Sequence, residues 1–279
     1  MVRIITDSAA DLEPKEYEAL NITCIPLKVM FGETEYEENV SLSKDLFYEL
    51  LASGEYPKTS QAAPQNLMDL FEQAKEAGDE AIYFCISSGI SGTYQTACAT
   101  KAMVDCDDCY VVDSKTATGG QRMLLEYAVR LRDQGKTARE IISAVEAIRD
   151  KVVVYACMDT LEYLYRGGRI SQTVYKLGTL AQVKPILRVT EEGTIEVPAK
   201  AMGMRKGMDY LCKRVEAQKP SSQHNFYAMY TGNRSNGLLL AEKFREMGCD
   251  VPEEKIINVG AAIGSHVGPN ACGMVYVKE

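Results

Sequence analysis

The stretch that decides the fold is AIYFCISSGISGT, residues 81–93. Its first six residues are apolar, which is typical of a buried strand. The next seven, SSGISGT, place serine and threonine hydroxyls and backbone N–H groups directly behind that strand. We expect a helix to begin at Thr93 or Tyr94, so the stretch reads as one βα unit. Two glycines let the backbone of the turn approach a ligand closely, and its free donors need an acceptor.

The first half of the chain repeats this alternation of strand and helix. Apolar residues recur at helical spacing over residues 41–54 and 66–78, and Gly78 is a stop signal. Thr137 and Glu140 have the spacing of a capping box. The helical faces that we expect to be buried are Leu42, Leu46, Phe47 and Leu50 in one helix, and Leu67, Leu70, Phe71 and Ala74 in the other. Such alternation predicts a parallel, Rossmann-like sheet with helices on both faces.

The pattern changes after residue 150. Residues 183–201, VKPILRVTEEGTIEVPAKA, read as two strands around a Glu-Glu-Gly turn, the only hairpin that we expect. We therefore predict an α/β protein of two domains. Residues 1–150 form an N-terminal parallel α/β domain, and residues 151–279 form a C-terminal α/β domain with a mixed or antiparallel sheet.

Composition and charge exclude several classes of protein. The 279 residues carry 31 Lys and Arg against 39 Asp and Glu, a net charge of −8, and no basic run is interleaved with aromatic residues. A nucleic-acid-binding surface is therefore not expected. No apolar stretch approaches the roughly 20 residues that cross a bilayer, and the first residues lack the features of a secretory signal. We expect a cytoplasmic protein that does not span a membrane.

The nine cysteines are predicted to be reduced, because most of them lie in apolar runs. Cys106 and Cys109 have CxxC spacing, but no second pair or nearby histidine completes a metal site, since His224 and His266 are the only histidines. We therefore expect no bound metal.

Several hydroxyl-rich turns follow predicted strands, where an open α/β sheet binds its ligands. They are TDS (6–8), KTSQAAP (58–64), SSGISGT (87–93) and VDSKTATGG (112–120). Helix capping alone explains any single turn of this kind. In the second half, Arg169 follows a glycine pair, where it can cap a helix end or bind an anion, and His266 lies among Gly264, Gly268 and Pro269. We expect His266 to be in a loop and to face a ligand.

A nucleophilic serine is the competing interpretation of these turns. The order Gly89-Ile90-Ser91-Gly92 does not match the GxSxG elbow of α/β hydrolases, and no GK[ST] follows to make a phosphate loop. A serine that meets His266 and an aspartate from distant segments stays open, as a serine hydrolase or a small-molecule transferase. A pure interaction protein, whose polar loops are only helix caps, also stays open.

Eight segments together resemble the signature segments of the DegV family. In chain order they are TDSAADL, KTSQAAP, SSGISGTYQTA, VDSKTATGG, LYRGGRIS, KPIL, EEGTIE and IGSHVGPNACG, which span residues 6–273. One departure is Ala62, where the family commonly has proline after TSQ.

The resemblance implies a lipid carrier that is not catalytic alone and needs no cofactor. It implies two α/β domains with a tunnel for a long-chain fatty acid, such as palmitate, stearate or oleate, between and within them. It also implies a partner, a separate ATP-dependent fatty acid kinase subunit that makes an acyl phosphate, a phospholipid precursor; transient contact with a membrane fits this role. The implied carboxylate ligands and their neighbours are Thr59, Ser60, Ser88, Ser91, Gly92 and His266, with Arg169 and His266 facing the head group or the kinase.

Overall fold

The computed structural model describes residues 1–176 and 182–279. Its first sheet has the strand order β2-β1-β6-β7, and all of its strands are parallel. The strands are β1 (Val2–Asp7), β2 (Ile22–Ile25), β6 (Glu80–Cys85) and β7 (Cys109–Asp113). The helices around this sheet are η1 (Ser8–Ala10), α1 (Pro14–Ala19), α3 (Pro64–Ala77), α4 (Thr93–Val104), α5 (Gly119–Asp133) and α6 (Ala138–Arg149).

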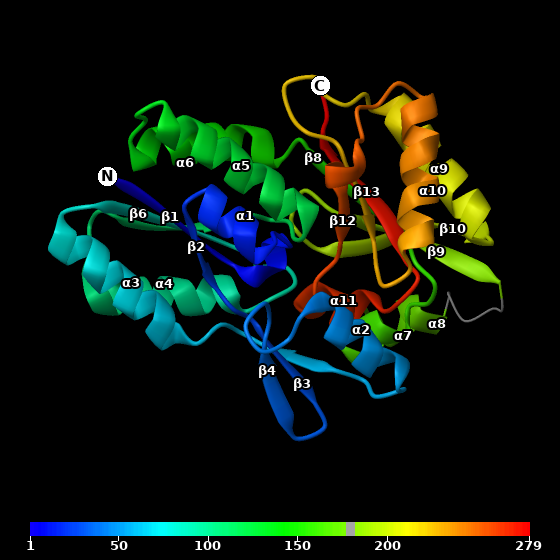
Figure 1. Cartoon of the computed structure of the whole chain (residues 1–279), viewed down its shortest axis with the longest axis horizontal. Helices are drawn as coiled ribbons and strands as arrows, with labels where there is room; N and C mark the ends of the chain where they lie inside the picture. The colour runs from blue at the N-terminus through cyan, green and yellow to red at the C-terminus, as the bar shows by residue number, and fades with distance from the viewer. Residues whose placement is uncertain (177–181) are drawn as a thin grey trace.

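Helices cover both faces of this sheet, as predicted (Figure 1). Phe71 of α3 and Ala97 of α4 pack against Tyr83 on one face. On the other face, Leu124 of α5 and Ile141 of α6 belong to a second core cluster. The alternation arises because successive side chains of a buried strand point to opposite faces, and each face then needs its own apolar cover.

The second sheet is mixed and has the order β10-β9-β8-β13-β11-β12. Only the pairing of β11 with β12 is parallel. Its strands are β8 (Val152–Cys157), β9 (Val183–Val189), β10 (Ile195–Met202), β11 (Tyr227–Tyr230), β12 (Ile256–Asn258) and β13 (Cys272–Val277). Helices α9 (Met204–Ala217) and α10 (Arg234–Glu246) cover its outer face, and η2 (Glu253–Lys255) precedes β12 (Figure 1). The predicted α/β fold with a parallel and a mixed sheet is therefore confirmed.

A third sheet, β4-β3-β5, was not predicted. Strands β3 (Lys28–Phe31) and β4 (Thr34–Glu37) form a hairpin whose turn contains Gly32 at φ 55°, and β5 (Lys58–Ser60) pairs antiparallel with β3. The predicted hairpin at residues 183–201 is confirmed, but the expectation that it is the only one is wrong. Strand β4 could not be predicted from the sequence, because it is largely exposed and its polar residues show no apolar alternation.

Short helices connect this small sheet with the rest of the molecule. They are α2 (Lys44–Ala52), α7 (Glu162–Arg166), α8 (Gln172–Lys176) and α11 (Ala261–Val267). In α2 the expected apolar face is partly wrong, because Leu46 is 37% exposed while Phe47 and Leu51 are buried. The reason is that Ser43 caps the helix, so Leu42 lies outside it and does not set its face.

Local signals along the chain match the structure more closely. Gly78 ends α3 in the left-handed conformation, and Thr137 and Glu140 form the expected capping box at the start of α6.

The prediction that all cysteines are reduced is wrong for one pair. Cys106 and Cys109 form a disulfide, because the turn between α4 and β7 brings their Cα atoms to 5.3 Å.

The chain passes from α6 to β8 at residues 150–151, next to the predicted domain boundary, and the division itself stays a prediction. No helix within residues 1–176 and 182–279 is long and apolar enough to cross a membrane. The same described residues contain no group of three or more His, Cys, Asp or Glu side chains that could hold a metal ion.

Candidate functional site

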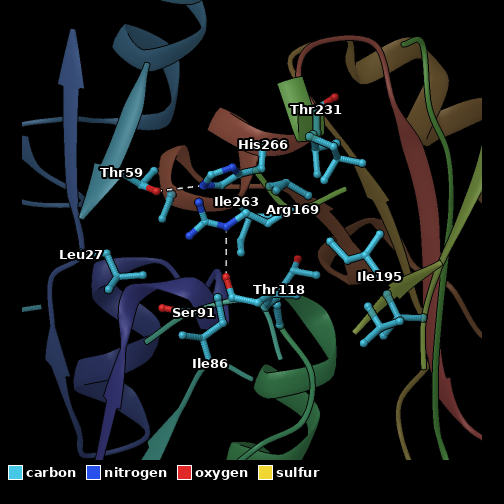
Figure 2. A pocket seen from close by; sticks show the side chains of 18 of the residues that line it. Leu27, Thr59, Ile86, Ser91, Thr118, Arg169, Ile195, Thr231, Ile263 and His266 are labelled. Carbon is cyan, nitrogen blue, oxygen red and sulfur yellow. Dashed lines mark hydrogen bonds between the residues drawn. The ribbon is translucent and has the colours of Figure 1, made fainter. Parts of the chain in front are cut away.

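A cavity of about 800 Å³ receives residues from both halves of the chain. Strand β8 shows how its wall is built. Val154 and Ala156 line the cavity, whereas Val153, Tyr155 and Cys157 pack against the core under α9 and α10. This alternation follows from the two-residue period of a strand. Further apolar lining residues are Ile86, Ala117, Leu187, Val189, Ile195 and Ile263, several of which are labelled in Figure 2.

Polar side chains gather in one part of this largely apolar cavity. Figure 2 shows Thr59, Arg169 and His266 close together, with Ser91 on the turn below them. The hydroxyl Oγ1 of Thr59 lies 2.8 Å from Nε2 of His266. Residues 207 positions apart thus share a hydrogen bond, because β5 and α11 pack side by side.

His266 lies in the last turn of α11, so the expectation of a loop is wrong. The start of this helix is held by Asp11, which follows η1, and by Glu38, which follows β4; these side chains accept hydrogen bonds from the N–H groups of Gly260 and Ala262. These caps come from more than 200 residues away, so no pattern around residue 266 could reveal them.

The His266 ring is neutral at physiological pH. Its burial, with the nearby positive charge of Arg169, lowers the pKa to about 4. Its Nδ1 is buried and has no hydrogen-bond partner in the described structure. With the ring proton on Nε2, no buried N–H lacks an acceptor, and Nε2 donates to Thr59 Oγ1. The Thr59 hydroxyl is then free to donate its own proton into the cavity.

Gly167 makes the position of this ring possible. A Cβ at residue 167 would lie 2.1 Å from Nδ1 and 2.7 Å from Cε1 of His266, far inside contact distance. In the sequence Gly167 is one of the two glycines that precede Arg169, and no local pattern links it with His266. Its role toward His266 depends on the packing of α7 against α11.

Arg169 is a half-buried cation that has no anionic partner within residues 1–176 and 182–279. Its Nε donates to the carbonyl of Ile90 at 3.0 Å, and its Nη1 donates to the carbonyl of Gly167 at 2.5 Å. Burial lowers its pKa, and no carboxylate of the described residues forms an ion pair with it. Lys28, another cation of the cavity wall, is paired with Glu35 at 2.6 Å. Arg169 therefore presents an uncompensated positive charge next to the polar group.

The serine turn contributes Ser91 and Gly92 to the cavity wall, and β5 contributes Ser60. Ser91 Oγ lies 2.8 Å from Thr93 Oγ1 and accepts a hydrogen bond from the Thr93 N–H at 3.3 Å. A Cβ at Gly92 would lie 2.3 Å from the terminal amide nitrogen of Gln61, so a larger residue there would displace the end of that side chain.

Ser88 is not brought together with the other predicted site residues. It is absent from the cavity wall, and its hydroxyl donates to Asp113 Oδ2 at 2.5 Å, while its N–H donates to Oδ1 at 3.1 Å. The turn reverses direction between Ser88 and Ser91, so the two serines serve different neighbours. Both Ser88 bonds go to the side chain of Asp113 at the end of β7, so Ser88 joins the turn to the neighbouring strand.

The described residues do not assemble a serine triad. The histidine that a triad would need bonds Thr59 rather than Ser91, and its Nδ1 has no carboxylate acceptor. A triad requires the base to contact the nucleophile and a third group to orient the base. This geometry gives no support to a serine hydrolase.

Comparison with known proteins agrees with the fold and the segments. The model of the family described as "Uncharacterised protein, DegV family" matches residues 1–279. A DegV domain-containing protein of Clostridium perfringens is 34% identical over an alignment of 284 positions, gaps included, which covers 99% of this chain and 97% of the relative.

Two solved structures superimpose closely on the model. The fatty acid binding protein DegV of Bacillus subtilis matches with a TM-score of 0.86 and 29% identity, over 100% of this chain and 99% of that one. A DegV family protein of Thermus thermophilus, solved for its fatty acid binding, matches with a TM-score of 0.88 and 27% identity over the same shares. The chain belongs to the DegV family.

Proposed function

We propose that this protein binds one long-chain fatty acid, such as palmitate, stearate or oleate, with the acyl chain in the cavity and the carboxylate at the polar group. The observation that carries the proposal is Arg169, a half-buried cation without an anionic partner that stands beside Thr59 and His266. A carboxylate would compensate this charge and accept hydrogen bonds from the hydroxyls of Thr59 and Ser91. The fatty acid binding relatives in Bacillus subtilis and Thermus thermophilus support the same ligand class.

The apolar wall accounts for the affinity. Burying about 14 methylenes at ~0.8 kcal/mol each supplies roughly 11 kcal/mol, before the cost of ordering the acyl chain. The carboxylate has to be satisfied at the end of the chain, since an unpaired buried charge costs several kcal/mol. Hydrophobic burial therefore holds the ligand, and the polar group orients it.

We further propose that the protein is a carrier that is not catalytic alone and that presents the carboxylate to a separate ATP-dependent kinase subunit. The residues around the polar group support the view that a kinase subunit can reach the carboxylate from outside. Lys28 and Glu35 of the β3–β4 hairpin, whose side chains are partly exposed, line the cavity together with Thr59. A guanidinium such as that of Arg169 can bind a phosphate as well as a carboxylate, so it suits both the bound acid and an acyl phosphate.

The first experiment is mass spectrometry of an organic extract of the purified protein, followed by titration with palmitate. We expect roughly stoichiometric fatty acid in the extract or tight binding of added palmitate. Protein that carries no fatty acid and binds none would refute the proposal.

The second experiment separates the role of these residues in binding the fatty acid from their role in its phosphorylation by the kinase. Arg169→Ala and His266→Ala are compared with the parent in palmitate binding and in acyl phosphate formation with a cognate kinase subunit. Arg166→Ala is the matched control, because Arg166 is exposed and paired with Glu162. A larger loss of phosphorylation than of binding supports presentation to the kinase, whereas equal losses limit both residues to the carboxylate site.

A further inference from the structure

Two buried carboxylates hold the helix that carries His266. Asp11 Oδ1 accepts a hydrogen bond from the N–H of Gly260 at 2.8 Å, and Glu38 Oε1 accepts one from the N–H of Ala262 at 3.0 Å. Asp11 is 1% exposed and Glu38 is 2% exposed. A carboxylate is favourable at the first turn of a helix, where the backbone N–H groups have no other partner. Residues from the beginning of the chain thus fix the start of α11.

The other two carboxylate oxygens are also occupied. Asp11 Oδ2 accepts the Thr118 hydroxyl at 2.5 Å, and Glu38 Oε2 accepts the Ser8 hydroxyl at 2.6 Å. In each side chain, one oxygen is therefore fixed by a hydroxyl group and the other accepts a hydrogen bond from the start of α11. Titratable groups that surround the pair are Lys44, Glu13, Tyr17, Cys24 and Tyr48.

Gly260 shows that the two side chains converge on one point. A Cβ at this residue would lie 2.3 Å from Glu38 Oε1 and 2.8 Å from Asp11 Oδ1. The backbone of Gly260 has ordinary dihedral angles, φ −76° and ψ −179°, so the need here is for space and not for a special conformation. The absent side chain is what lets both carboxylates reach the helix.

The far end of the same helix reaches the candidate ligand site. From Gly260 to His266 the chain rises by about 9 Å, at about 1.5 Å per residue. His266 meets Thr59 with 2.8 Å between Nε2 and Oγ1, a distance that tolerates a displacement of only a few tenths of an ångström. Figure 2 shows α11 passing directly behind this pair of side chains. A shift of the first turn would therefore move the imidazole.

We propose that Asp11 and Glu38 are positioning residues of the head-group site, which anchor α11 and thereby hold His266 Nε2 against Thr59. Neither side chain lines the cavity, so neither touches the ligand. The proposal rests on the proposed function, in which this pair of groups meets a carboxylate.

The test compares binding of palmitate with binding of hexadecanol, which has the same chain length and no carboxylate. Asp11→Ala and Glu38→Ala are measured beside Asp11→Asn and Glu38→Gln, which keep an oxygen acceptor for the helix. Glu126→Ala is the control, because this carboxylate also joins the two halves, by accepting from Tyr227 and Asn225, but lies away from α11. We expect the alanine variants to lose at least fivefold in palmitate affinity and little in hexadecanol affinity. The amide variants should stay within about twofold of the parent.

The second readout is the ¹⁵N resonance of the His266 ring, for which His224 is the only other histidine and an internal reference. The alanine variants should shift the His266 resonance and leave that of His224 in place. If a folded alanine variant keeps both the palmitate affinity and the His266 resonance, or loses palmitate and hexadecanol equally, the proposal is wrong. If neither alanine variant folds, Glu38→Asp, which withdraws the acceptor by one methylene, is judged by the same criteria. A parent protein that binds no palmitate refutes the proposed function, while the His266 resonance still tests the positioning.

Discussion

Replacing Gly167 by alanine should weaken fatty acid binding, although residue 167 does not itself line the cavity. The new Cβ would lie 2.1 Å from His266 Nδ1, whereas ordinary contact needs about 3.5 Å, so the ring has to retreat by about 1.4 Å. The hydrogen bond to Thr59 spans 2.8 Å and does not survive a movement of that size.

The expected loss follows from what the displaced groups do. A hydrogen bond to a charged acceptor contributes about 1.5–3 kcal/mol, and a neutral one about 1 kcal/mol. We therefore expect a loss of about 1–3 kcal/mol, which is roughly 5- to 150-fold in Kd. Isothermal titration of delipidated protein with palmitate measures it, and thermal unfolding checks that the variant is folded.

The neighbouring glycine supplies a matched control. Gly168 has φ +72° and no atom within 4 Å of a built Cβ, so Gly168→Ala strains the backbone by about 1 kcal/mol but leaves His266 in place. In a His266→Ala background, Gly167→Ala should have little further effect on binding, because its steric target is gone. Parental affinity of Gly167→Ala, or an equal loss in Gly168→Ala, would show that this reasoning is wrong.

Three further outcomes are expected. Ser91→Ala and Thr59→Ala should each weaken palmitate binding by about 1–3 kcal/mol with the fold intact, and unchanged Kd values for both would place the carboxylate elsewhere. Burial, reinforced by the charge of Asp11, raises the pKa of Glu38 to about 7, so its contribution to stability is present below about pH 4.5 and is lost as the pH rises through 7. Denaturation with urea at pH 5 and pH 8 should therefore show a smaller decrease in Glu38→Gln than in the parent, by up to about 3 kcal/mol, and identical decreases would contradict the raised pKa. Ala156→Phe, which adds a ring to the cavity wall, should reduce affinity for stearate more than for shorter acids, and an equal effect on all chain lengths would argue that the acyl chain does not pass β8.

Elements that depend on nearby residues could be predicted from the sequence. The βα unit at residues 81–104, the end of α3 at Gly78, the capping box of Thr137 and the hairpin at residues 183–201 are all confirmed. Each depends on apolar periodicity or on a cap within a few residues, so the residues that determine it are close together in the sequence. The eight segments in chain order also predicted the family, which the comparisons confirm.

The tertiary structure alone decided how the candidate site is assembled. Ser88 and Ser91 are three residues apart and looked equivalent, yet one bonds Asp113 while the other lines the cavity. His266 looked like a loop residue, because the carboxylates that cap its helix lie more than 200 residues earlier in the chain. Side-chain direction and distance at a site depend on packing between segments far apart in sequence. Local pattern specifies which elements form, and only their packing specifies which of their polar groups meet.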